Sequence, residues 1–209
     1  MATLTSFYIY SIEKALVVEQ LRQLSGITTI TELSNAKNLG GDWLLDDRKL
    51  PTYLAVGQTN KDWVAVVHNS FNKLESWCVK LSLHLQTKVI VTMAQSVSDV
   101  YYFALYDSGR KLREIEVCYS GDDHPVNYGE KFDFEEEEPG RRDEFEGEVE
   151  YFFGFEEMEH YCQQFGLEIQ TDYSQMTWTV FNSNKKYGIG EAYLASGGKK
   201  SQKPWWKFW

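Results

Sequence analysis

The chain has 209 residues and a formal net charge of −10, and this composition excludes some classes of protein. Contacts to nucleic-acid phosphates need clustered Lys and Arg, so an acidic chain argues against nucleic acid as a partner. With 43% hydrophobic and 15% aromatic residues, the chain is long and apolar enough to bury a large core.

The N-terminal third predicts a small α/β layer. Apolar residues spaced three and four apart predict a helix over residues 12–24, and Ser25-Gly26 ends it. Short β-prone runs surround this helix, at residues 6–10, 27–33, 40–45 and 52–56. No linker separates this layer from the middle of the chain, so we expect it to join the main sheet.

The middle of the chain, from Trp63 to Tyr119, predicts a strand, a helix and three more strands. The first strand covers residues 62–68, and Asn69 or Ser70 is suited to cap the next helix. The later strands cover residues 88–93, 97–106 and 111–119. The strand over residues 97–106 is apolar on both faces, which predicts a place in the middle of a sheet that is covered on both sides.

The last part of the chain predicts a helix over residues 156–165 and a strand over residues 176–181. The expected fold class is therefore α+β, with a mixed, largely antiparallel sheet and two or three helices packed on it. We expect one domain over residues 1–196, with an acidic insertion at about residues 120–150 and a C-terminal tail at residues 197–209.

The three cysteines predict the cellular compartment. Cys78, Cys118 and Cys162 are far apart and form no C-x-x-C pair, which favours reduced thiols in a cytoplasm. The first residues lack the basic and apolar regions of a signal peptide, and no apolar run approaches the roughly 20 residues that span a bilayer. We expect a cytoplasmic protein.

Motifs of catalysis and metal binding are few. Asp122, Asp123 and His124 are adjacent in a loop, which is more typical of a solvated turn than of a metal site. Residues 188–192 have the glycines of a phosphate loop without the strand and helix that such a loop needs. We therefore expect no catalytic residue, no metal and no cofactor.

The acidic segment over residues 130–150 has eleven acidic residues against three basic ones. One interpretation is a solvated loop, because blocks of like charge usually stay in water. The other is a docking surface for a basic protein, in which acids steer the partner and phenylalanines anchor it. The candidate partner-binding residues are Phe132, Phe134, Glu135, Glu136, Glu137 and Glu138.

The tail combines lysines with aromatic side chains, and three of the seven tryptophans lie in the last five positions. Indole rings favour a bilayer interface and lysines favour anionic head groups, so the tail predicts binding to an anionic membrane surface or to a protein groove. In the membrane case the protein would lie at the inner face of the membrane. The candidate residues are Lys203, Trp205, Trp206, Lys207, Phe208 and Trp209.

The pattern of residues 63–119 carries a resemblance. A Trp-containing strand, a helix, a β-branched strand, the run Tyr-Tyr-Phe-Ala-Leu-Tyr-Asp-Ser-Gly-Arg and a charged returning strand resemble uncharacterised bacterial α+β proteins that accompany toxins as immunity or defence-associated proteins. The resemblance implies binding rather than catalysis. We expect a non-enzymatic bacterial protein that neutralises or regulates a basic, toxin-like protein partner; the alternative is a peripheral membrane protein anchored by its tail.

Overall fold

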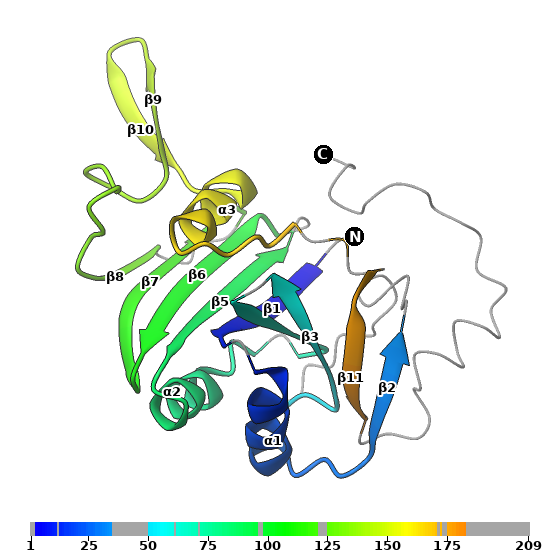
Figure 1. The fold of residues 1–209 in the computed structure, drawn as a ribbon. Coiled ribbons are helices and arrows are strands. Elements are labelled where there is room, and N and C mark those ends of the chain that lie inside the picture. Colours follow the sequence, from blue (N-terminus) through cyan, green and yellow to red (C-terminus); the bar gives the residue numbers. More distant parts are fainter. Residues whose placement is uncertain are drawn as a thin grey trace, which may run out of the picture.

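A computed structural model describes residues 3–11, 13–34, 50–60, 62–70, 72–95, 98–120, 125–170, 172 and 175–182. These residues form a nine-stranded sheet, a two-stranded hairpin and three helices, which confirms the predicted α+β class (Figure 1). The elements are β1 (Thr3–Tyr10), α1 (Lys14–Ser25), β2 (Ile30–Ser34), β3 (Tyr53–Asn60), β4 (Trp63–His68), α2 (Glu75–His84), β5 (Lys88–Gln95), β6 (Val100–Asp107), β7 (Arg110–Cys118), β8 (Val126–Gly129), β9 (Arg141–Phe145), β10 (Glu148–Phe152), α3 (Phe155–Gln164) and β11 (Thr177–Asn182).

The strand order of the large sheet is β2-β11-β3-β4-β1-β5-β6-β7-β8, and every pairing among the described strands is antiparallel. The first strand of the chain lies in the centre, because β1 pairs with β4 on one side and with β5 on the other. The N-terminal layer is thus built into the main sheet.

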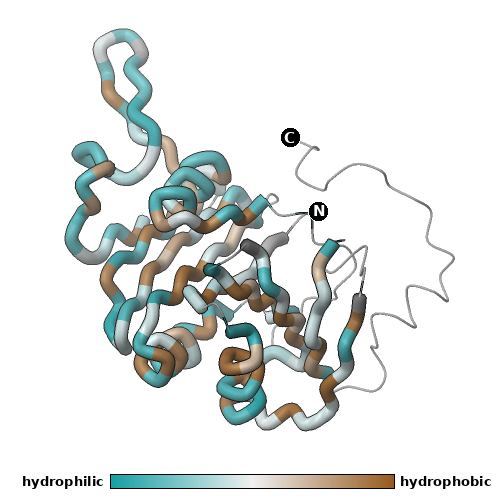
Figure 2. Tube along the Cα trace, in the orientation of Figure 1, coloured by the Kyte–Doolittle hydropathy of each residue, from teal (hydrophilic) through white to brown (hydrophobic). Residues whose placement is uncertain are grey.

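Each face of the sheet has its own hydrophobic core. Alternation along a strand sends successive side chains to opposite faces, so in β1 Phe7 and Ile9 face α1 and α2, whereas Tyr8 faces α3. Figure 2 shows hydrophobic residues concentrated along the central strands and hydrophilic residues along the β9–β10 hairpin. Both Trp63 and Trp77 are buried, one in each core.

β6 occupies an interior position covered on both faces, as its sequence predicts. All residues from Tyr101 to Tyr106 are buried, and the strand pairs with β5 and β7. Tyr101, Phe103 and Leu105 face α3, and Tyr102, Ala104 and Tyr106 face α2.

The start of α2 differs from the prediction. The side chains of Asn69 and Ser70 do not cap the helix: Asn69 Oδ1 accepts hydrogen bonds from the main-chain nitrogens of Thr52 and Tyr53 at 3.1 Å, and Ser70 Oγ accepts one from Asn72 N at 3.0 Å. The helix therefore begins at Glu75. The strand predicted at residues 40–45, the Asp122–His124 loop, the glycines at residues 188–190 and the tail lie outside the described residues.

Candidate functional site

Residues 130–152, which we call the acidic arm, consist of a loop after β8 and the β9–β10 hairpin. The hairpin projects from the body of the protein next to α3 (Figure 1). The arm has eleven acidic and three basic residues, a formal charge of −8. The sequence pattern predicted an acidic insertion in this part of the chain. In the structure this segment is folded and is not a simple loop.

The hairpin forms because its turn has suitable chemistry. Glu146 and Gly147 are the two central residues, with φ of 53° and 87°, and Phe145 pairs with Glu148 across the turn. Positive φ at both central residues is typical of a type I′ turn, whose twist matches that of the flanking strands. The turn therefore allows the two charged segments that flank it to pair as strands.

The loop of the arm is held by aromatic packing against α3. Phe132 and Phe134 stack with a centroid distance of 5.2 Å, and both make edge contacts with Tyr161 and Phe165. Both phenylalanines are half-buried and pack against the core on this face of the sheet. They anchor the loop to its own protein; their predicted role in anchoring a partner stays a prediction.

A buried ion pair fixes the same loop to the edge of the sheet. Arg113 of β7 donates from Nε and Nη2 to the two carboxylate oxygens of Glu135, at 2.9 and 2.6 Å, and both side chains are fully buried. The remaining nitrogen, Nη1, donates to Asn127 Oδ1 and to the Tyr128 carbonyl of β8. Burial, together with the charge of Glu135, raises the pKa of Tyr161 above its ordinary value. Glu135 is therefore internal to the protein, and its carboxylate is unavailable to a partner.

The base of the hairpin is attached at two points. Phe152 stacks on Tyr119 with a centroid distance of 5.0 Å, and the Tyr119 hydroxyl accepts a hydrogen bond from Phe153 N at 2.8 Å. On the other side, Glu157 of α3 lies 3.7 Å from Arg141 and accepts a hydrogen bond from Gly154 N. These contacts connect the hairpin to the end of β7 and to the start of α3.

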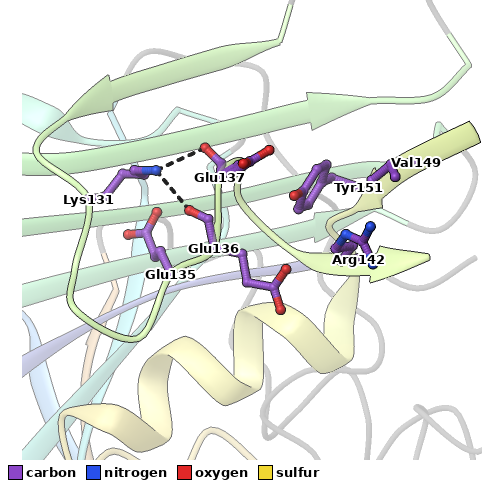
Figure 3. Close-up of a pocket in the computed structure, with 7 residues that line it drawn as sticks. All are labelled: Lys131, Glu135, Glu136, Glu137, Arg142, Val149 and Tyr151. Carbon is purple, nitrogen blue, oxygen red and sulfur yellow. Dashed lines mark hydrogen bonds between the residues drawn. The ribbon is translucent and has the colours of Figure 1, made fainter. Parts of the chain in front are cut away.

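A pocket of about 440 Å³ lies between the loop and one face of the hairpin (Figure 3). The hairpin contributes Arg142, Val149 and Tyr151, which alternation and strand register place on one face. The loop contributes Lys131, Glu135, Glu136 and Glu137, and Lys131 Nζ donates to the main-chain oxygens of Glu136 and Glu137 at 3.0 and 3.2 Å.

Two of the three carboxylates of this pocket, those of Glu136 and Glu137, are not neutralised within the described part of the chain, whereas Glu135 is paired with Arg113. The side chains of Glu136 and Glu137 are exposed and make no ion pair with a described residue. The two arginines of the arm are already paired, Arg141 with Asp143 and Arg142 with Glu144, each at 3.2 Å. The arm therefore presents uncompensated negative charge to solvent.

The predicted partner-binding residues thus fall into two groups. Phe132, Phe134 and Glu135 hold the arm in place, whereas Glu136, Glu137 and Glu138 are exposed on it. Sequence reasoning missed the hairpin and its pocket residues Arg142, Val149 and Tyr151. Gly147, which directly precedes the alternating segment Glu148–Phe152, was the signal that would have indicated the hairpin.

Other kinds of site receive no support from the described residues. Among them, no group of three or more His, Cys, Asp or Glu side chains is arranged to hold a metal ion. None of the described helices combines the length and the hydrophobicity needed to cross a membrane. Comparisons with protein-family models, with curated proteins and with solved structures found no significant match.

Proposed function

We propose that this chain is a non-enzymatic bacterial protein that binds a basic protein partner through its acidic arm, and neutralises or regulates that partner as an immunity protein does a toxin. The observation that carries this proposal is the attachment of the arm. The Arg113–Glu135 pair and the Phe132–Phe134 stack fix the loop, while Glu136, Glu137 and Glu138 face solvent. A fixed array of charges loses less conformational entropy on binding than a free loop does.

The arm also offers apolar surface beside its charges. Val149 and Phe152 of the hairpin are 44% and 39% exposed, and Tyr128 of the neighbouring β8 is 54% exposed. Negative charge speeds the encounter with a basic protein, and exposed aromatic and aliphatic groups supply contact area after it. The steering by negative charge and the exposed apolar contact area both favour a protein partner over a small molecule.

The test is the association rate of the full chain with the protein encoded directly upstream of it, measured at low and at high salt. The double variant Glu136→Lys with Glu137→Lys reverses two exposed charges and leaves Glu135 in place. The control Glu13→Lys with Glu19→Lys makes the same change in net charge at solvent-accessible positions before and on α1, against the other face of the sheet.

We expect the arm variant to associate about tenfold more slowly than wild type at low salt, and the control to associate at nearly the wild-type rate. The difference should shrink as salt screens the charges. Absence of binding, or equal rates for the arm variant and the control, would overturn the proposal.

A second candidate function rests on the tail. Trp205, Trp206 and Trp209 stand beside four lysines over residues 199–207, a composition that favours the interface of an anionic membrane. Under this alternative the protein is held peripherally at the inner face of the membrane. The full chain should then bind anionic vesicles, whereas a chain without the tail should not.

A further inference from the structure

The pocket face of the acidic arm combines apolar contact area with carboxylates that make no ion pair with a described residue. Of the two cations that also line it, Arg142 is paired with Glu144 and Lys131 donates to main-chain oxygens. Glu136 and Glu137 lie on the loop side, and Val149 and Tyr151 lie on the hairpin side (Figure 3). Val149 is 44% exposed and Tyr151 is half-buried. A surface of this kind suits a ligand in which cationic and aromatic side chains stand close together.

Residues 197–209 of this same chain have that chemistry. They contain four lysines and no acidic residue, so their charge of +4 is opposite to the −8 of the arm. Trp205, Trp206, Phe208 and Trp209 come after the first three lysines. Pro204 disfavours a helix at this point and favours an extended conformation for the residue before it.

The chain is long enough for this contact. Lys199 lies seventeen positions after Asn182, the last residue of β11, and seventeen residue-to-residue steps span up to about 56–61 Å when extended. The seven steps from β11 to β8 across the sheet amount to about 34 Å at about 4.8 Å each. A ligand tethered in this way has an effective concentration of about 1 mM, so even a weak contact is populated.

We propose that residues 197–209 dock intramolecularly on the pocket face of the acidic arm and cover the surface that a basic partner uses. The consequence for partner binding rests on the function proposed above, but the docking itself does not. The segment then acts as an internal competitor: a partner must displace it, and only a basic partner with enough affinity for the arm does so.

The test is the rate at which trypsin cuts the full chain after Lys199, Lys200 and Lys207, with mass spectrometry of the products. At an ionic strength of about 0.01 M, we expect these bonds to be cut about threefold or more slowly in wild type than in the variant Glu136→Gln with Glu137→Gln. A free peptide of residues 197–209 calibrates the protease at each salt concentration.

The matched control is Glu148→Gln with Glu150→Gln, which removes the same charge from the opposite face of the same hairpin. This control should stay as protected as wild type. Since all four glutamates are exposed, unchanged unfolding midpoints verify that both variants keep the fold.

Three results would overturn the proposal: equal cutting rates in wild type and the pocket-face variant, equal loss of protection in both variants, or protection that increases with protein concentration. The last would indicate a second copy as the source of the contact. Partner binding is measured separately, by the association rates described above. Protection of the segment, together with unchanged partner association rates in Glu136→Lys/Glu137→Lys, would uphold the docking and refute the proposed function. Absence of protection, together with slower partner association in that variant, would refute the docking and uphold the proposed function.

Discussion

Glu135 illustrates how neighbouring, identical residues take different roles. Its side chain is fully buried against Arg113, whereas Glu136, Glu137 and Glu138, the next three residues, are exposed. The sequence shows four equivalent glutamates. Their environments differ because Arg113 reaches one of them from β7, and that proximity is created only when β8 pairs with β7 and turns the chain back. Reversing all four charges would therefore damage the fold as well as the surface.

Loss of one partner from the Arg113–Glu135 pair should be costly. A buried charge left without its partner destabilises a protein by about 3–5 kcal/mol, so we expect a loss of this size in Arg113→Met and in Glu135→Leu, measured by urea unfolding. The double variant Arg113→Met with Glu135→Leu leaves no unpaired charge and should recover most of the loss. A loss below about 1 kcal/mol in both single variants, the range of an exposed pair, would contradict this.

His68 should make the protein sensitive to mild acid. The residue is 2% exposed, its imidazole lies against the ring of Phe7, and burial lowers its pKa from 6.5 to about 3. Between these values the unfolded chain binds a proton that the folded chain does not. The free energy of unfolding should therefore fall as pH decreases below about 6.5, by up to about 1.4 kcal/mol per pH unit.

The measurement for His68 is urea unfolding between about pH 5 and pH 7, above the range in which ordinary carboxylates titrate. The variant His68→Asn lacks the titrating group and should show a shallower dependence on pH. Identical slopes in the two proteins would show that His68 is not the cause.

At the scale of elements, the sequence predicted the helices and strands whose residue patterns are local. The order from β4 through α2, β5, β6 and β7 follows from β-branched runs and one apolar stripe. The central place of β1 was not predictable, because periodicity specifies a strand but not its neighbours. The strands β9 and β10 were missed because acidic residues have low β propensity, and the arm depends on distant contacts with Tyr119 and α3.

The position of β6 leads to a prediction about stability. Phe103 is fully buried, lies between β5 and β7, and contacts Tyr161 of α3 with a centroid distance of 5.3 Å. We expect Phe103→Ala to lower the free energy of unfolding by about 3–5 kcal/mol, through lost burial and a residual cavity.

The control for Phe103 is Leu83→Ala on α2, since Leu83 is 47% exposed. Its substitution should change the free energy of unfolding by about 0.5 kcal/mol or less. Urea unfolding of both variants provides the measurement, and a nearly unchanged midpoint for Phe103→Ala would contradict the packing described for this strand.

At the scale of the whole molecule, charge is unevenly distributed. Residues 1–196 carry −14, of which the acidic arm carries −8, and residues 197–209 carry +4. An anionic surface therefore repels most of the chain and attracts its last residues. Any binding to such a surface should be local and should weaken with salt.

The membrane alternative predicts that the full chain co-sediments with anionic vesicles, because each lysine near the surface contributes about 1 kcal/mol and the indole rings add to it. A chain that ends at Ser196 should remain in the supernatant, and neutral vesicles should retain less of the full chain. If full and shortened chains both stay in the supernatant, the membrane alternative is wrong.

The central position of β1 has a consequence for how the chain reaches this structure. β1 pairs with strands much later in the chain, as when Ser6 meets Val67 and Phe7 meets Val91, and Ile30 of β2 likewise pairs with Phe181. Such a high contact order is typical of domains that fold in about milliseconds to seconds. A nascent chain therefore holds β1 unpaired until β4 and β5 have been made. Deleting β1 would remove the strand that joins the two halves of the sheet, a far greater change than trimming an edge.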